Sequence, residues 1–274
     1  MMEFYKMDGA GNDFVVVDNR EGRYNLGREE IARICHRRFG VGADGLMTLE
    51  AGEEGFDFEM KYYNSDGRLG SMCGNGGRCI AAFAYILGVK GSEMKNDGEG
   101  EGHRCFHFRG YDGAHEAEII TWDKEQRVGL VRLGMRSVAA EAVRRVEEGW
   151  FLDTGSPHYV QRVKDLEHYD VVAEGRRLRN RSDLFPEGTN VDFIEDLPDG
   201  RLFVRTYERG VEDETWACGT GVTACAIVTG NHRLVTRGGD FRVDFDATGT
   251  AYENVRLTGP VSLNYIGRWT SSAQ

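Results

Sequence analysis

The chain has 274 residues, a formal net charge of -11 at pH 7 and a hydrophobic fraction of 40%. No apolar run approaches the roughly 18 residues of a membrane-spanning helix, and the acidic balance argues against nucleic acid or an anionic membrane as the main partner. The segment that starts at Met1 lacks the apolar stretch and cleavage site of a signal peptide, so we expect a cytoplasmic protein.

The first part of the chain predicts a hairpin, a helix and a series of strands. The turn at 8–13 joins two strands, and the spacing of Ile31, Ile34 and Cys35 predicts a helix over 28–39. Residues 91–102 are polar and glycine-rich, which is typical of a surface loop. Strands are predicted over residues 4–7, 14–18, 46–50, 56–63, 105–108, 117–122 and 128–133.

After residues 138–146 the same kind of pattern begins again. A turn at 154–157 lies between two strands, and residues 170–179 indicate a helical or mixed segment. A glycine turn at 219–221 leads into the apolar run 222–228, as an earlier glycine turn leads into 79–87. Strands are predicted over residues 150–153, 158–163, 191–195, 202–207, 241–245, 248–252, 255–257 and 261–266.

This second pattern is a copy of the first at a fixed offset. Cys218 follows Cys73 by 145 positions (218 minus 73), and the same offset superimposes residues 8–15 on 153–160. The offset also brings Tyr62 onto Tyr207, Phe14 onto Tyr159, Gly74 onto Gly219, and Gly76 onto Gly221. We therefore expect a duplicated α/β half of α+β type, with residues 1–115 and 116–263 as the two halves and the tail 264–274 returning to the first.

Six cysteines lie in the chain, and in a long cytoplasmic protein they are expected to be free thiols. Structural zinc usually shows close Cys-x2-Cys pairs, whereas the closest spacings here are Cys73 to Cys79 and Cys218 to Cys225, so no metal site is expected. Cys79 and Cys225 fall on apolar helices and Cys35 shares a helix face with Ile31, which indicates three core positions. Cys105 begins a predicted strand and shows no pattern that would indicate a function.

Cys73 and Cys218 are different, because each ends a strand-like run directly before a glycine turn and an apolar helix. A cysteine beside glycine is often only a small buried side chain, but two at one offset favour a shared function. At a helix N-terminus the macrodipole and unpaired N–H groups favour a thiolate. Two copied turns related by a pseudo-twofold axis would present two thiols to opposite faces of a ligand in a cleft between the halves.

Opposed thiols suit inversion at a carbon next to a carboxylate. One group must remove the α-proton and the other must return a proton from the far side, which a thiolate and a thiol achieve near neutral pH. Backbone N–H groups of Gly74-Asn75 and Gly219-Thr220 are placed to hold the carboxylate and its developing negative charge. Such a site needs neither a metal nor pyridoxal phosphate.

Several polar residues near the two turns suit an amino-acid ligand. Arg209 and Asn64, which share the offset, suit a carboxylate, and Glu208 suits an ammonium group. A surface ion pair is the alternative interpretation of Glu208 and Arg209. His158 is either a catalytic neighbour or an ordinary strand histidine.

Six motifs in order resemble those of diaminopimelate epimerases: residues 4–14 (Phe4 to Phe14), 64–67 (Asn-Ser-Asp-Gly), 72–76 (Met-Cys-Gly-Asn-Gly), 188–190 (Gly-Thr-Asn), 208–210 (Glu-Arg-Gly) and 217–221 (Ala-Cys-Gly-Thr-Gly). The tail 259–261 also fits. The resemblance implies an epimerase that needs no cofactor and interconverts LL- and meso-diaminopimelate in lysine and peptidoglycan precursor synthesis. It also implies two pseudo-symmetric halves, each a strand-wrapped central helix, and a homodimer.

Position by position, the resemblance assigns Cys73 and Cys218 as the acid/base pair, and the turns Gly74-Asn75 and Gly219-Thr220 as the cradle of the reacting carboxylate. The positions that match substrate-binding residues are Asn12, Asn64, Asn190, Glu208 and Arg209. The chain departs from the family pattern twice. Ser156 stands where an asparagine often precedes Pro-His, and Gly45 follows Asp44 where some members have glutamine.

Three alternatives remain at this point. A proline-racemase-like enzyme would share the fold and the paired thiols, but that family tends to have histidine where Asn75 follows Cys73-Gly74. A thiol redox protein would form a disulfide between Cys73 and Cys218, although no Cys-x-x-Cys motif is present. A non-catalytic amino-acid-binding protein would not need both cysteines.

Overall fold

The computed structural model describes residues 1–70, 73–94 and 103–270. The chain divides into two compact units, Met1–Leu133 with Pro260–Gln274, and Gly134–Gly259. The division falls 18 residues later than the boundary expected after residue 115 (133 minus 115), because β7 and β8 pair with the strands of the first unit. Met72 and the part of the expected loop at 95–102 lie outside the described residues.

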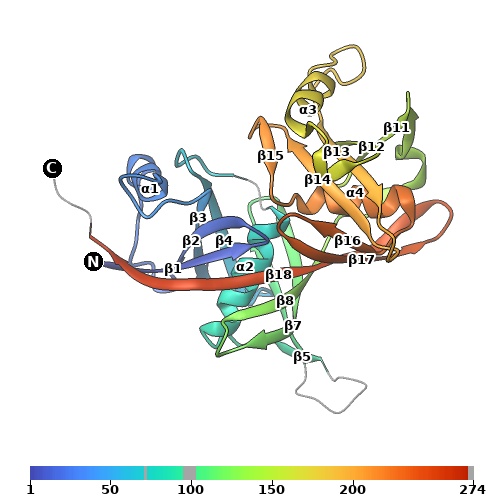
Figure 1. Ribbon diagram of the computed structural model, residues 1–274. Coiled ribbons are helices and arrows are strands. Elements are labelled where there is room, and N and C mark those ends of the chain that lie inside the picture. The colour runs from blue at the N-terminus through green and yellow to red at the C-terminus, as the bar shows by residue number, and fades with distance from the viewer. Residues whose placement is uncertain (71–72, 95–102, 271–274) are drawn as a thin grey trace. The chain divides into compact units, whose positions relative to one another are not determined.

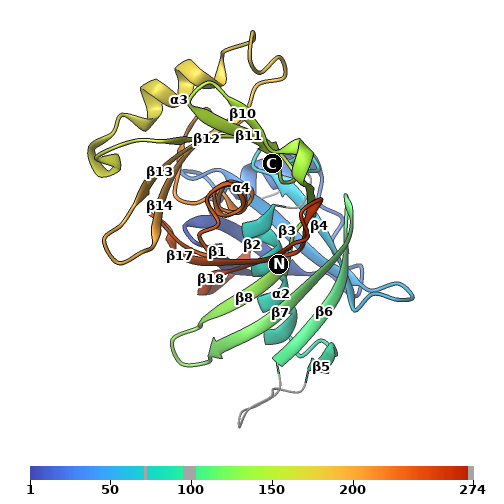
Figure 2. The same cartoon turned by 90° about the vertical axis from the view of Figure 1, so that its right-hand side faces the viewer.

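The first unit is a curved sheet around one helix (Figure 1). Its helix α2 packs against β1, β2, β3, β4 and β7, and Figure 2 shows the strands on several sides of it. The elements are β1 Met2–Gly9, β2 Asn12–Asp18, α1 Arg28–Cys35, β3 Gly45–Ala51, β4 Phe58–Asn64, α2 Gly74–Ile86, β5 Ser92–Met94, β6 His103–Gly110, β7 Gly113–Asp123 and β8 Val128–Gly134.

The second unit is built in the same way around α4. This helix packs against β11, β12, β13, β14, β16 and β17. The elements are β9 Val138–Ala139, β10 Arg144–Val146, β11 Gly149–Asp153, β12 Pro157–Arg162, α3 Val171–Arg179, β13 Asn190–Asp196, β14 Leu202–Glu208, β15 Asp213–Thr215, α4 Gly219–Thr229, β16 Arg233–Thr236, β17 Gly239–Ala247 and the first part of β18 Ala251–Trp269, which belongs to the first unit from Pro260 on. Two short 3-10 turns, Ala140–Ala142 and Leu166–His168, complete it.

The two units repeat one order of strand pairing. β1–β2 is antiparallel, β2–β3 parallel, β3–β4 antiparallel and β4–β6 parallel. In the second unit β11–β12, β12–β13, β13–β14 and β14–β16 follow the same alternation. The helices α2 and α4 begin at Gly74 and Gly219, again 145 residues apart (219 minus 74). The expected α/β fold with a strand-wrapped helix in each half is thereby confirmed.

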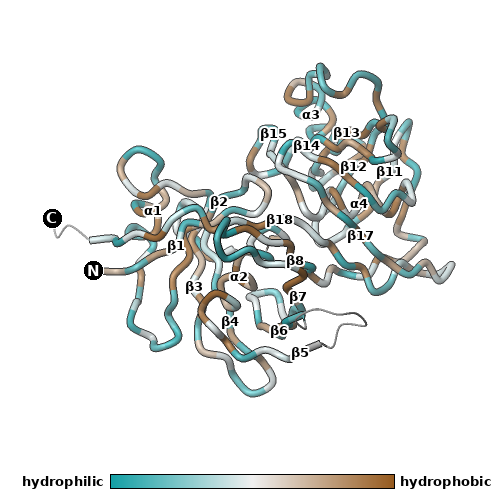
Figure 3. The backbone as a smooth tube through the Cα atoms, turned by 60° about the horizontal axis from the view of Figure 1, so that its bottom comes forward, coloured by the Kyte–Doolittle hydropathy of each residue, from teal (hydrophilic) through white to brown (hydrophobic). Residues whose placement is uncertain are grey.

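Small and apolar side chains explain why both helices are central. Every residue of α2 from Gly74 to Ala84 is buried, and all but Thr220, Val228 and Thr229 are buried in α4. A helix that is apolar on all sides is stable only when it is covered on all sides. Glycines and alanines let the surrounding strands approach closely. In Figure 3 the hydrophobic stretches of both units lie in strands and buried helices, while many turns are hydrophilic.

Two sequence predictions of secondary structure are wrong in extent. The first helix ends at Cys35 rather than at 39, because the His36 ring accepts the N–H groups of Arg38 and Phe39 and turns the chain. The predicted strands 255–257 and 261–266 and the end of 248–252 belong to one strand, β18, while residues 248–250 lie outside it. The pairing of β17 with β18 shifts in register between Asp244 and Asp246, opposite the polar residues near Asn254, which has a φ of 50°. The strand continues through this bulge, where the sequence predicted a break between two strands.

Candidate functional site

The first cysteine turn starts α2. Cys73 is the N-cap residue, and its sulfur accepts a hydrogen bond of 3.2 Å from the N–H of Gly76. The first N–H groups of a helix have no partner within the helix, and they carry the positive end of its dipole. A sulfur in this place is therefore surrounded by partial positive charge, as the sequence predicted.

Two asparagines lie beside Cys73. The Cys73 thiol is 3.9 Å from Asn12 Oδ1, which also accepts from Asn75 Nδ2 at 3.4 Å. The other end of the Asn12 amide is fixed, because its Nδ2 donates to Asp44 Oδ2 at 2.7 Å. The structure thus brings Cys73, Asn12 and Asn75 together within the first unit.

Asn64 and Gly45 lie a short way off on paired strands. Asn64 ends β4 with an exposed side chain, and it pairs with Gly45 of β3. A Cβ at position 45 would lie 2.5 Å from the ring of Tyr62 and 2.6 Å from the Tyr63 carbonyl. The packing of Tyr62 and the backbone at Tyr63 therefore require glycine at position 45.

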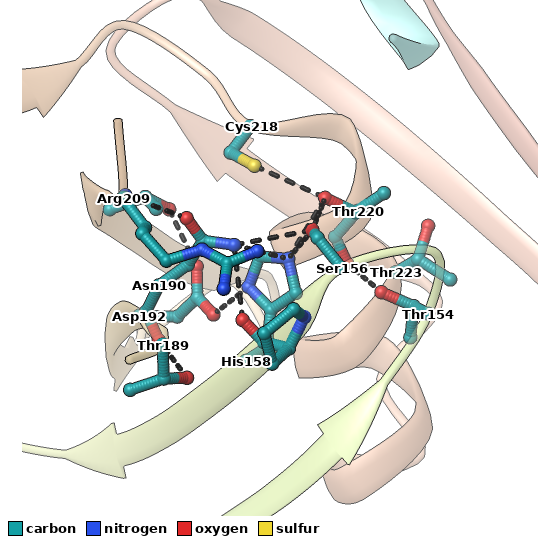
Figure 4. A network of polar contacts seen from close by, with 12 residues as sticks. Thr154, Ser156, His158, Thr189, Asn190, Asp192, Arg209, Cys218, Thr220 and Thr223 are labelled. Carbon is teal, nitrogen blue, oxygen red and sulfur yellow. Dashed lines mark hydrogen bonds and ion pairs between the residues drawn. The ribbon is translucent and has the colours of Figure 1, made fainter. Parts of the chain in front are cut away.

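The second cysteine turn starts α4 with different partners (Figure 4). Cys218 is the N-cap residue, but its side chain accepts no capping hydrogen bond from the helix. Its sulfur instead lies 3.3 Å from Thr220 Oγ1, and the residue is 8% exposed. Gly219 and Thr220 form the first turn, as predicted.

His158 is fully buried beneath this turn. Its Nδ1 lies 2.7 Å from Asp192 Oδ2, and its Nε2 lies 2.8 Å from Thr220 Oγ1 and 3.0 Å from Ser156 Oγ. Burial lowers the pKa of His158, but the Asp192 carboxylate outweighs burial and, with a smaller contribution from Cys218, raises it to about 10. The ring is therefore an imidazolium at neutral pH, and both of its nitrogens donate.

Asp192 was not among the residues predicted for the site. It is fully buried on β13, and its second oxygen accepts from Thr206 Oγ1 at 2.7 Å. A Cβ on Gly221 would lie only 2.3 Å from this oxygen, so glycine is required there by close approach. The available signal was a single acidic residue inside the apolar run 191–194.

Asn190 connects the turn to the end of β14. Its Nδ2 donates to Ser156 Oγ at 3.2 Å and to the Pro157 carbonyl at 3.0 Å, while its Oδ1 accepts from the N–H of Arg209 at 2.8 Å. Figure 4 shows Arg209 beside Asn190, and its guanidinium donates to the Glu187 carbonyl at 2.9 Å. Glu208 is the last residue of β14 and is half-buried.

The predictions made for the other cysteines can now be compared with the structure. All six cysteines are free thiols, and Cys35, Cys79 and Cys225 are buried, as predicted. Cys105 is buried as well. Within the described ranges, no helix is long and apolar enough to cross a membrane, and no cluster of three His, Cys, Asp or Glu side chains is suited to a metal ion.

The sequence is similar to proteins of one family. The diaminopimelate epimerase family profile matches residues 4–103 and 150–255. A diaminopimelate epimerase of Chlorobaculum tepidum is 43% identical over 228 residues, which cover 81% of each chain. One from Aquifex aeolicus is 37% identical over an alignment that covers 97% of each chain.

Solved structures share the fold at much lower identity. A probable proline racemase from Agrobacterium radiobacter has a TM-score of 0.70 at 13% identity, over 99% of this chain and 94% of that one. A hydroxyproline epimerase from Agrobacterium vitis, with bound trans-4-hydroxy-L-proline, has a TM-score of 0.67 at 16% identity, over 97% and 91%. These likenesses concern the fold alone.

Proposed function

Since this chain belongs to the diaminopimelate epimerase family and is therefore an isomerase, we propose that it interconverts LL- and meso-diaminopimelate without a cofactor. The product would serve lysine and peptidoglycan precursor synthesis. The observation that carries the proposal is that Cys73 and Cys218 each cap the N-terminus of a buried central helix. The family resemblance that rested on six sequence motifs is confirmed by these comparisons.

The reaction needs one thiolate and one thiol. The thiolate takes the α-proton and becomes S–H, and the electron pair of the broken C–H bond moves into the carboxylate to form an enediolate. The opposite thiol then gives its proton to the other face of the α-carbon and becomes the thiolate. The two cysteines exchange protonation states in each turnover, and the stereochemistry at that carbon is inverted.

Negative charge on the reacting carboxylate must be stabilised while the α-proton is absent. The first-turn N–H groups at Gly74-Asn75 and Gly219-Thr220 supply fixed donors at the positive ends of two helix dipoles. Donors that are already in position need no reorganisation as the charge develops. This arrangement supports catalysis without a metal or pyridoxal phosphate.

His158 and Ser156 support the second turn. The His158 imidazolium contacts Thr220 Oγ1, and that hydroxyl in turn contacts the sulfur of Cys218. The Thr220 hydroxyl thus connects the His158 imidazolium to the sulfur of Cys218. Ser156 stands where the family resemblance often places an asparagine, and its hydroxyl accepts from Asn190 while it contacts His158.

The second amino-acid group of diaminopimelate would be bound by Asn190, Glu208 and Arg209, together with Asn64 and Asn12. Asn190 and Arg209 are already joined by a hydrogen bond of 2.8 Å, so their positions are fixed relative to each other. A guanidinium and an amide suit the distal carboxylate, and the Glu208 carboxylate suits the distal ammonium group. A proline racemase has no use for such a set, because proline carries no second amino-acid group.

The direct test is to incubate LL-diaminopimelate with reduced protein in D2O. We expect meso-diaminopimelate that carries deuterium at one α-carbon, and no conversion of L-proline. Absence of both isomerisation and deuterium uptake would overturn the proposal. Conversion of L-proline alone would favour the proline-racemase alternative. Activity that depends on an electron acceptor would favour the redox alternative.

A further inference from the structure

The helix that begins at the first cysteine turn, α2, contains a charged residue that has no role in the proposed mechanism. Arg78 lies in the second turn of α2 and is fully buried, with 0% exposure. Its Nη2 donates to Asn75 Oδ1 at 2.8 Å and its Nη1 donates to the Gly74 carbonyl at 3.2 Å. Both partners belong to the turn that cradles the reacting carboxylate in the proposed function.

The second copy shows what the fold alone requires at this position. Arg78 corresponds to Thr223 at the offset of 145 (223 minus 78). Thr223 is also fully buried, and its hydroxyl donates to the Gly219 carbonyl at 2.9 Å. The same bond to the first helical residue is therefore made by a neutral side chain. Since burial of a charge is costly, the charge of Arg78 is not explained by the helix.

The position of Arg78 orients the side chains around Cys73. Because Asn75 Oδ1 accepts from Arg78, Asn75 Nδ2 is directed to Asn12 Oδ1, which the Cys73 thiol also faces. Burial lowers the pKa of Arg78 to about 10, and the interaction with Cys79 and Cys73 opposes that change. The guanidinium is thus still a cation at neutral pH, and the sulfur of Cys73 lies within its electrostatic influence.

Several acidic groups on or beside the elements that pack against α2 have partners of their own. Asp8 of β1 accepts from the N–H of Gly11 and from Asn264. The other such pairings are Asp13 of β2 with Lys6 and Arg37, Asp44 with Asn12 and Arg37, Glu50 of β3 with Asn19, Thr48 and Lys61 of β4, and Glu118 of β7 with His103 and Arg132. Arg78 contributes a charged side chain that bonds directly to the first turn of α2.

We infer that Arg78 is a positioning residue for the proposed reaction, which favours the thiolate form of Cys73 and fixes the side-chain amide of Asn75 toward Asn12, beside that thiol. This inference rests on the proposed function for its purpose. It makes a statement about the pKa of one thiol in one unit, which can be measured without enzymatic turnover. The Cys73–Asn12 contact favours the thiol, but at 3.9 Å it is longer than the 3.2 Å contact with the Gly76 N–H, which favours the thiolate.

The experiment measures the pH dependence of Cys73 alkylation by iodoacetamide in the full chain with Cys218→Ala, and peptide mass analysis identifies the modified cysteine. We expect the Cys73 thiol to titrate below the ordinary value of about 8.5. Arg78→Met should raise that titration by roughly one unit or more, since an opposite charge nearby shifts a pKa by about that much. Arg78→Lys, which keeps the charge, should raise it less.

The matched control is Thr223→Val, which removes the equivalent bond in the second copy and should leave the Cys73 titration unchanged. An unchanged titration in folded Arg78→Met would overturn the inference. So would a titration at or above about 8.5 in the parent with Cys218→Ala, a measurement that does not depend on whether the Arg78 variants fold. If Arg78→Met raises the Cys73 titration as expected but the chain with both cysteines intact shows no epimerisation, the role of Arg78 stands as a property of the turn and the proposed function fails.

Discussion

The two cysteine turns have the same backbone arrangement and different means of supporting negative charge. In the first unit, Cys73 is bonded to an N–H of its own helix, and the nearby cation Arg78 belongs to that helix as well. In the second, Cys218 contacts Thr220, and the cation is His158 on β12, which Asp192 on β13 holds in place. Duplication kept the geometry of the turn, while the source of positive charge differs between the copies.

This difference has a chemical consequence. The Arg78 cation is permanent at neutral pH, whereas the His158 cation depends on its Asp192 partner. An epimerase needs two thiols that can each be base or acid, but they need not be equal. Variants of the residues in each turn can measure how far the two turns differ, and the largest effect is expected from the loss of a cysteine.

Replacement of either cysteine by alanine should abolish epimerisation. Cys73→Ala and Cys218→Ala each remove one of the two proton carriers, and loss of a general acid or base costs at least roughly 100-fold. Turnover of LL-diaminopimelate measures the effect. Cys79→Ala is a matched control, because Cys79 is buried on the same helix and should tolerate the change with activity retained. Equal activity in Cys73→Ala and Cys79→Ala would end the two-thiol interpretation.

The His158–Asp192 pair should make stability depend on pH. The pKa of His158 is raised to about 10 in the folded chain, above an unfolded value of about 6.5. Its contribution is therefore complete below about pH 6.5 and is lost as the pH rises toward 10. Urea denaturation at several pH values should show a decline in that window that His158→Gln lacks. Parallel curves for the two proteins would contradict the assigned charge.

Gly221→Ala should be more damaging than Gly76→Ala. A methyl group at 221 would lie 2.3 Å from Asp192 Oδ1, which is held on both sides, while one at 76 would lie 3.2 Å from Cys73 Sγ and 3.3 Å from the flexible Met47 side chain. We expect Gly221→Ala to lower the free energy of unfolding by about 1–3 kcal/mol. Denaturant titrations of both variants test the order, and a larger loss for Gly76→Ala would reverse the comparison.

Thr220→Val should have a smaller effect that is confined to the second turn. The hydroxyl lies between His158 Nε2 and the sulfur of Cys218, so its loss breaks the chain of polar contacts that joins the imidazolium to that sulfur. A net hydrogen-bond contribution of about 1 kcal/mol corresponds to a loss of roughly five- to tenfold in kcat/KM. Thr220→Ser retains the hydroxyl and should retain most activity. If both variants behave alike, the hydroxyl has no such role.

Much of the local structure could be predicted from the sequence. The hairpin at 8–13, the two glycine turns and the helices after them follow from short-range patterns, and the offset of 145 relates the two copies. The partners of the turns could not be found in this way. His158 and Asp192 are neighbours only because β12 and β13 pair in parallel across 34 residues of sequence, and local patterns carry no information on such pairing.

Arg78 illustrates a second limit of the sequence. It stands in an apolar, alanine-rich run, where an arginine is most simply interpreted as the exposed edge of a helix. Its complete burial depends on strands β1, β2, β3, β4 and β7, which close around α2 from distant parts of the chain. The long strand β18 escaped prediction for a related reason, since its irregularity near Asn254 resembles a turn until its partners are known.

The pairing of β18 also affects the order in which the molecule can be completed. Residues Arg242–Ala247 of β17 pair with one end of β18, and Met2–Asp8 of β1 pair with the other, where Met2 meets Trp269. During synthesis β1 is therefore made before the second unit and its partner in β18 after it, so that this edge stays open while the second unit is made. An open strand edge is a template for wrong pairing. The time for which this edge of the nascent chain is exposed to aggregation therefore depends on how many residues separate β1 from its partner in β18.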